Sequence, residues 1–119
     1  GAQVAELLQQ ADHPAAGALW DLHHPYREGE PPEVTVQLLA PYLRHTHVKD
    51  SRSGRYCLMG EGDVPLTGML ALLRRQGYND WISVEWEKRW HPEIAPPEKA
   101  FPQYARKLRK VLAQSATPS

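Results

Sequence analysis

Apolar positions in the first third of the chain predict a helix, a strand and a second helix. Residues 4–11 carry apolar side chains at helical spacing, and the DHP tripeptide that follows ends this segment, because proline disfavours helix in the preceding residue. The run GALWDL is short and apolar, which predicts a buried strand whose C-terminal end carries Asp21. A helix over residues 34–43 follows a proline-rich entry, and we expect Pro41 to kink it.

The segment RHTHVKD predicts a second strand, because it is short and alternates in character. The alternation places His45, His47 and Lys49 on one side of the strand and Thr46 and Val48 on the other. After it, SRSG has the composition of a loop, RYCLM is expected to form a brief strand, and GEGD is a glycine-rich turn.

The last third of the chain predicts a helix, a third strand and a final helix. Residues 65–77 combine an early proline, a broad apolar face, two terminal arginines and a closing glycine, which together are typical of a complete helix. The segment WISVEWE is β-branched and aromatic until it reaches Glu85. A helix over residues 96–114 follows, and we expect residues 114–119 to form a frayed tail.

Strands that alternate with helices in this order indicate an α/β fold built from parallel βα units. Such strands need both of their faces covered, and three of them make a narrow sheet for a stable domain of this class. The pattern therefore predicts part of a larger sheet.

Composition narrows the classes of function. At 119 residues the chain has the size of one small domain, and 14 basic and 14 acidic residues cancel, which argues against nucleic acid or an anionic membrane as a partner. The sequence has no run long and apolar enough to span a bilayer, and its N-terminus lacks the pattern of a signal peptide. With Cys57 as the single cysteine, we expect a soluble, cytoplasmic protein.

Each predicted strand of the sheet delivers a residue that could bind a metal ion: Asp21, His47 and Glu85. The C-terminal ends of parallel strands face a common side, so these residues could converge although many residues separate them in the sequence. Two carboxylates and one imidazole suit Mn²⁺, Mg²⁺, Co²⁺ or Zn²⁺, with positions left for substrate. Taken one at a time, each residue is more often a helix cap, a solvated charge or a hydrogen-bonded histidine.

Other polar and aromatic residues are weaker candidates. Trp86 and Trp90, near Glu85, could wall a small hydrophilic pocket, although packing is the commoner role of tryptophan. Arg52 and Arg55 could bind a phosphate or carboxylate group. The segment GEGDVP lacks the spacing of a nucleotide-binding loop, and the motifs GxSxG, CxxC and HExxH are absent from the sequence.

Four motifs together resemble the C-terminal part of sugar phosphate isomerases/epimerases of the xylose isomerase-like TIM-barrel superfamily: WDLHH, HTHVKD, GEGDVPLTGMLALLRRQGYNDWISVEWE and HPEIAPPEKAFPQYARKL. That superfamily also contains ketose 3-epimerases and inosose dehydratases. The resemblance covers nearly the whole chain and is specific for the superfamily, not for a substrate. It implies a partial (β/α)8 TIM barrel, in which residues 1–119 are the C-terminal portion, the last three βα units, of a barrel of roughly 250 residues.

The resemblance also implies roles for single residues. Asp21, His47 and Glu85 match metal ligands of the family, Glu85 also matches a proton-transfer group, and His24 matches a histidine that contacts substrate oxygens. Two departures accompany these matches. Ser53 stands where ketose 3-epimerases have a substrate-binding arginine, and the family's other metal-binding glutamate belongs to a strand that would lie upstream of this chain.

The activity implied by the resemblance is that of a divalent-metal-dependent sugar or sugar phosphate isomerase/epimerase, which moves a proton next to a carbonyl through an enediolate. Trp86, Arg52 and Arg55 join His24 as expected substrate-binding residues. Unpaired strand edges predict a homo-oligomer or pairing with the missing N-terminal half, without which the chain could be inactive. The rival class is a non-catalytic half-barrel that serves in assembly and retains ancestral metal-site residues. Endonuclease-like action on DNA is disfavoured by the zero net charge.

Overall fold

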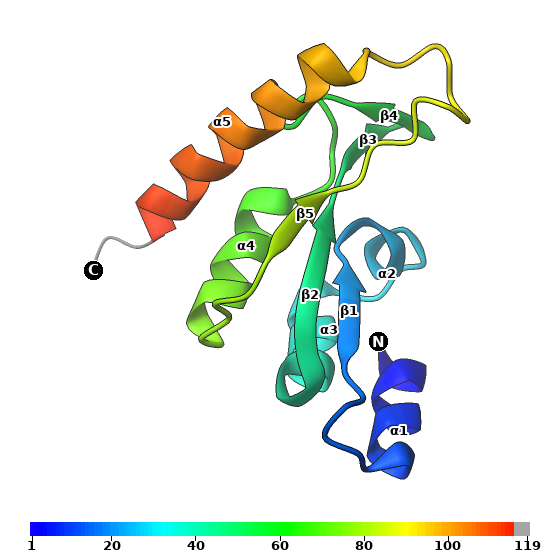
Figure 1. Ribbon diagram of the computed structural model, residues 1–119, viewed down its shortest axis with the longest axis vertical. Coiled ribbons are helices and arrows are strands. Elements are labelled where there is room, and N and C mark those ends of the chain that lie inside the picture. The colour runs from blue at the N-terminus through cyan, green and yellow to red at the C-terminus, as the bar shows by residue number, and fades with distance from the viewer. Residues whose placement is uncertain (116–119) are drawn as a thin grey trace.

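The computed structural model describes residues 1–115 and contains a three-stranded parallel sheet with helices packed on one of its faces (Figure 1). In chain order the elements are α1 (Ala2–Ala11), β1 (Ala18–Asp21), α2 (His23–Arg27), α3 (Pro32–Leu39), η1 (Ala40–Tyr42), β2 (Leu43–Val48), β3 (Asp50–Arg52), β4 (Arg55–Cys57), α4 (Leu66–Arg75), β5 (Ile82–Val84) and α5 (Pro97–Ser115). None of the helices in this part of the chain is both long and apolar enough to cross a membrane.

The sheet has the strand order β1-β2-β5, with both pairings parallel. This arrangement confirms the α/β class and the parallel strands expected from the sequence, and it forms part of a barrel rather than a closed one. Asp21 lies opposite His47 in the register, and His47 lies opposite Ser83. Within the described residues β1 and β5 each pair with β2 alone, so the sheet has two open edges.

The two faces of the sheet differ in polarity and in what covers them. One face carries the buried side chains of Trp20, Thr46 and Val48, and Trp20 and Val48 belong to the core cluster formed with residues of α3 and α4 such as Val36 and Leu70. The opposite face carries Leu19, which is 50% exposed and lies opposite the half-buried His45 in the register, and the half-buried His47, which lies opposite Asp21. The predicted alternation along β2 is therefore confirmed, since Thr46 and Val48 are fully buried.

Several local predictions needed correction. The helix expected over residues 34–43 begins at Pro32 and ends at Leu39, because Pro41 lies in the short 3-10 turn η1 instead of kinking a longer helix. The SRSG segment, expected as a loop, is a turn only at Ser53 and Gly54, which have positive φ, because Asp50–Arg52 form the strand β3. The brief strand expected in RYCLM is confirmed as β4, which pairs with β3 in an antiparallel hairpin. The frayed tail expected over 114–119 falls mainly on residues 116–119, which lie outside the described residues, and α5 ends at Ser115.

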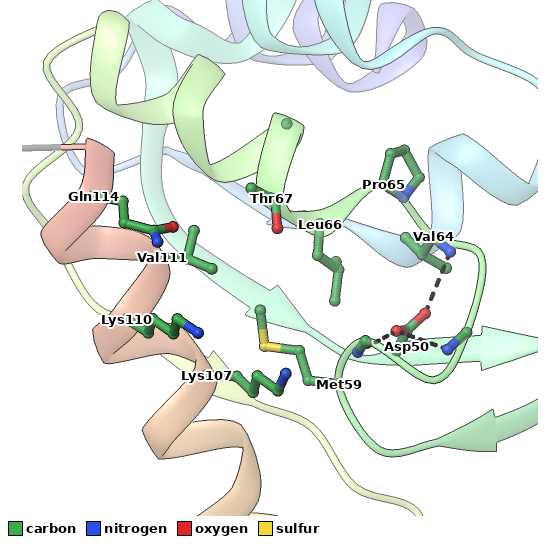
Figure 2. A pocket seen from close by; sticks show the side chains of 13 residues that line it. Asp50, Met59, Val64, Pro65, Leu66, Thr67, Lys107, Lys110, Val111 and Gln114 are labelled. Carbon is green, nitrogen blue, oxygen red and sulfur yellow. Dashed lines mark hydrogen bonds between the residues drawn. The ribbon is translucent and has the colours of Figure 1, made fainter.

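The glycine-rich segment after the hairpin is organised by the buried carboxylate of Asp50. This carboxylate accepts hydrogen bonds from the backbone N–H groups of Ser51 (2.9 Å), Gly60 (2.8 Å), Gly62 (3.1 Å) and Val64 (3.3 Å). Figure 2 shows the carboxylate inside the loop, with the bonds to the drawn residues as dashed lines. A Cβ atom at Gly62 would collide with the Asp50 carboxylate and with the Ser51 carbonyl, so the turn requires glycine there. These N–H groups, which could have cradled a phosphate, serve Asp50 instead.

Helix α5 is tied to the hairpin through Tyr104. Its fully buried hydroxyl accepts a hydrogen bond from the Asp50 N–H (2.8 Å) and donates one to the Cys57 carbonyl (2.7 Å). Burial raises the pKa of the Tyr104 phenol well above its usual value, so it remains a neutral donor. Burial, aided by Asp50, also raises the pKa of the Cys57 thiol to about 11, which leaves this cysteine unsuited to act as a thiolate near neutral pH.

Candidate metal centre

Asp21, His47 and Glu85 meet on the open face of the sheet, at its C-terminal end. One ligand atom from each residue lies within 4.8 Å of the other two. Strand pairing brings them together: Asp21 ends β1 directly opposite His47 of β2, and the Glu85 N–H donates to the Val48 carbonyl at 3.2 Å, which extends the β2–β5 pairing to the third ligand. The convergence expected from the strand-end positions is therefore present in the structure.

The donor atoms of this group fit a divalent cation. His47 Nδ1 lies 3.6 Å from Glu85 Oε2. Two atoms that each lie about 2.1 Å from the same ion are about 3 to 4 Å apart, so this spacing suits two ligands of one ion. An imidazole nitrogen with two carboxylate oxygens is a mixed donor set that Zn²⁺, Mn²⁺ and Co²⁺ accept readily, and the carboxylates also suit Mg²⁺.

Neighbouring groups orient the side chains of Asp21 and His47. The Oδ1 atom of Asp21 accepts the His23 N–H at 2.9 Å, at the start of α2, which fixes the carboxylate by its first oxygen. On β2, His45 Nε2 and Ser83 Oγ are 2.8 Å apart, and the His45 ring stands edge-on to the His47 ring with 5.2 Å between centroids. The imidazole of His47 is thus held by a neighbour that is itself hydrogen-bonded to β5.

The Lys49 side chain lies against Asp21 and Glu85, and it was not among the site residues expected from the sequence. Its Nζ donates to Glu85 Oε2 and to Glu87 Oε1, both at 3.2 Å, and lies 3.7 Å from Asp21 Oδ2. Burial by itself lowers the pKa of this amine, but attraction to Asp21 and the hydrogen bonds to Glu87 and Glu85 outweigh burial and raise the pKa above its usual value. Lys49 and Glu87 could have been found from the sequence. Lys49 stands two positions after His47 and Glu87 two positions after Glu85, and alternate residues of an extended chain point to the same side.

Of the two histidines after Asp21, His24 is exposed on α2 and His23 is buried. The metal group of the described residues does not include His24, whose ring meets the His23 ring at 6.2 Å. His23 Nε2 lies 2.8 Å from Ser51 Oγ, while its buried Nδ1 has no hydrogen-bond partner in the described structure. Burial, followed by the nearby Lys49 and Arg27 cations, lowers the pKa of His23. The His24 side chain, in contrast, is exposed to solvent on α2.

The remaining candidates lie outside the three-residue group. Arg55 donates to the Glu93 carbonyl at 2.8 Å, and Arg52 is exposed beside it on the hairpin. The indole N–H of Trp86 donates to the Ala95 carbonyl at 2.8 Å, and its ring packs against Tyr104. The structure thus places Trp86 in packing against α5, while Trp90 is largely exposed.

Two cavities lie near these elements. One of about 360 Å³ is lined by His23, Arg27, Ser51, Tyr56 and Asp63 among others, and the Tyr56 ring lies 4.9 Å from Lys49 Nζ, which places this cavity beside the metal group. A cavity of about 580 Å³ between the Asp50 loop, α4 and α5 is lined by none of the three metal-group residues (Figure 2).

Comparison with known proteins gives consistent matches in sequence. A sequence model described as "Xylose isomerase-like TIM barrel" matches residues 1–111. The inosose dehydratase of Clostridium tetani is 25% identical over 134 aligned positions, which cover 96% of this chain and 43% of that enzyme. The inosose dehydratase of Bacillus anthracis is 24% identical with the same two coverages. The chain therefore spans less than half the length of these relatives.

Solved structures agree on the fold. A xylose isomerase domain protein from Planctomyces limnophilus superposes with a TM-score of 0.73 at 21% identity, over 98% of this chain and 43% of that one. The IolI protein, solved with a zinc atom, gives a TM-score of 0.76 at 18% identity, over 98% of this chain and 44% of that one.

Proposed function

Because this chain belongs to the xylose isomerase-like TIM barrel family, we propose that it supplies three ligands of a divalent-metal site for proton transfer next to a carbonyl in a sugar-like polyol. The observation that carries this proposal is the meeting of Asp21, His47 and Glu85 at one end of the sheet. The zinc atom in the IolI structure and the names of the dehydratase relatives support it.

In this proposal Asp21, His47 and Glu85 hold Mn²⁺, Mg²⁺, Co²⁺ or Zn²⁺. When bound, such an ion acts as a Lewis acid that polarises the substrate carbonyl and makes the neighbouring C–H more acidic. Three protein ligands leave coordination positions for substrate oxygens or for a further ligand. His24, exposed at the rim on α2, is the proposed contact to a substrate oxygen.

Glu85 is the proposed proton acceptor. Its side chain is 36% exposed, and its contacts to His47 and Lys49 both use Oε2. The second oxygen, Oε1, is thereby available to take a proton from carbon even while Oε2 serves as a ligand. A carboxylate bound to a cation is a weak base, so the proposal requires Glu85 to accept the proton through this free oxygen.

The fate of the electron pair left on carbon decides the product. Expulsion of a β-hydroxyl group as water gives dehydration, the reaction in the names of the relatives. Delivery of a proton to the other face of the same carbon by a second acid on that face gives epimerisation, and delivery of a proton to the neighbouring carbon gives isomerisation. All three outcomes begin with the same proton abstraction by Glu85. Arg52 and Arg55, which line a surface hollow of about 400 Å³, remain proposed contacts for an anionic substrate group.

The open edges of the sheet support a proposal about partners. β1 and β5 are paired on one side only, and the uncovered face displays Leu19 and the 79% exposed Trp81. Unpaired strands with apolar side chains favour association. We propose that a second copy of this chain, or the remaining strands of a barrel, covers this face and adds groups to the site.

Calorimetric titration of the purified chain with Mn²⁺, with the molar mass measured on the same sample, tests the proposal. We expect saturable binding of about one ion per chain, a mass that is a multiple of 13.5 kDa, and Mn²⁺-dependent exchange of the C–H next to the carbonyl of a polyhydroxy ketone in deuterated water. A folded chain that binds no Mn²⁺ contradicts the metal site. Binding without exchange favours the non-catalytic half-barrel, and a monomeric mass excludes a second copy as the cover of this face and leaves the remaining strands of a barrel.

A further inference from the structure

A single buried ammonium group lies among three carboxylates at the metal group. The side chain of Lys49 is 3% exposed, and its Nζ lies within 3.7 Å of oxygens from Asp21, Glu85 and Glu87. Two of these carboxylates are proposed metal ligands, and the third belongs to a residue outside the ligand set. The Tyr56 ring faces the same nitrogen at 4.9 Å, which closes off the remaining side.

We propose that Lys49 is a positioning residue that sets the net charge of the metal site, so that the site favours a divalent over a trivalent cation. The inference rests on the proposed function. With the histidines neutral, three carboxylates and one ammonium carry a net charge of −2, which one divalent cation neutralises. Without the ammonium the same carboxylates would carry −3 and match a trivalent cation instead.

Geometry makes this role specific to Lys49. The Nζ contacts Oδ2 of Asp21 and Oε2 of Glu85, so it is near both ligand carboxylates at once. Because the side chain is buried, solvent screens its charge only weakly, and the charge acts on an ion a few ångströms away. His91, whose Nε2 lies 3.5 Å from Glu87 Oε2, is the nearby titratable group on the outer side of the cluster.

The test compares Mn²⁺ and Tb³⁺ affinities in charge variants. Lys49→Met keeps the apolar stem but removes the charge. In this variant we expect the ratio Kd(Tb³⁺)/Kd(Mn²⁺) to fall at least about tenfold, because a trivalent ion gains more than a divalent ion from the loss of a neighbouring cation. In Glu87→Gln the cluster carries a net charge of −1, and we expect the ratio Kd(Tb³⁺)/Kd(Mn²⁺) to rise by at least about threefold. The double variant restores −2 and returns most of the way to the wild-type ratio.

Lys88→Met is the matched control. The Lys88 ammonium donates to the Ile94 carbonyl at 2.7 Å and to the Pro92 carbonyl, and it contacts no carboxylate in the described structure, so its loss should leave the ratio unchanged. An equal loss of affinity for Mn²⁺ and Tb³⁺ in Lys49→Met would show that the lysine only holds the carboxylates in place, which overturns the inference.

Three further outcomes keep the test decisive. If Lys49→Met does not fold, a folded Glu87→Gln chain with an unchanged ratio overturns the inference on its own. If the wild-type chain binds neither ion, the proposed function itself fails. If it binds Mn²⁺ but no variant shifts the ratio, only the role of Lys49 is wrong.

Discussion

Replacing Glu85 by glutamine is expected to weaken Mn²⁺ binding about a hundredfold or more and to abolish the proposed proton exchange. Loss of a group that hydrogen-bonds to a metal ligand typically costs 10- to 100-fold in metal affinity, and loss of a direct anionic ligand should cost at least as much. A hundredfold change corresponds to about 2.8 kcal/mol. Calorimetry with Mn²⁺ on the wild-type and Glu85→Gln chains measures the effect directly.

The fold should survive this substitution. Lys49 keeps its contacts to Glu87 and Asp21, so no unpaired buried charge remains, and glutamine has nearly the volume of glutamate. Glu93→Gln removes an exposed carboxylate from the same segment and should leave Mn²⁺ affinity unchanged. Mn²⁺ affinity that stays within threefold of wild type in a folded Glu85→Gln chain would remove Glu85 from the ligand set and with it the proposed acceptor.

Replacing Asp50 by alanine is expected to destabilise the chain by about 3 to 5 kcal/mol. The substitution leaves the N–H groups of Ser51, Gly60, Gly62 and Val64 without their acceptor, and each orphaned buried donor costs about 1 to 3 kcal/mol unless water replaces the lost oxygen. Since Asp50 also lines a cavity, we expect partial hydration, which places the total below the simple sum. Urea unfolding followed by circular dichroism measures the change.

Two variants make this measurement specific. Glu61→Ala removes an exposed carboxylate from the same loop and should change stability by less than about 0.5 kcal/mol. Asp50→Asn keeps one acceptor oxygen but turns an amide NH2 toward the backbone donors, so its loss of stability should fall between those of Glu61→Ala and Asp50→Ala. An Asp50→Ala chain as stable as Glu61→Ala would mean that the loop does not depend on its central carboxylate.

The elements and faces that follow a strong periodicity could be predicted from the sequence. The helix over 65–77 carries a full set of start and stop signals and appears as α4, Leu66–Arg75. The alternation through His45, Thr46 and His47 fixed which side chains of β2 face the helices. The gathering of Asp21 and Glu85 beside His47 followed from a general property of parallel strands, although their role as ligands remains a prediction.

Elements that have no hydrophobic periodicity could not be predicted from the sequence. Helix α2 has five residues and includes Pro25, so no apolar repeat could announce it. Strand β3 has three residues in a polar segment and was not predicted, and its pairing with β4, the brief strand expected in RYCLM, defines it. The sequence placed Asp50 at the end of the predicted strand RHTHVKD and gave no sign of its role, which arises from backbone donors 10 to 14 positions later that fold back around it. Such long-range satisfaction of hydrogen bonds leaves no local pattern.

The three proposed ligands lie at the ends of three different strands, with Glu85 directly after β5, and this makes metal binding and sheet formation mutually dependent. No two of Asp21, His47 and Glu85 are close in the sequence, so an unfolded chain offers an ion only scattered single donors. An ion that binds the assembled sheet but not the unfolded chain stabilises the fold by about 2.7 kcal/mol when its concentration is 100 times the Kd. The same linkage means that damage to strand pairing, even far from the ligands, would be felt as a loss of metal affinity.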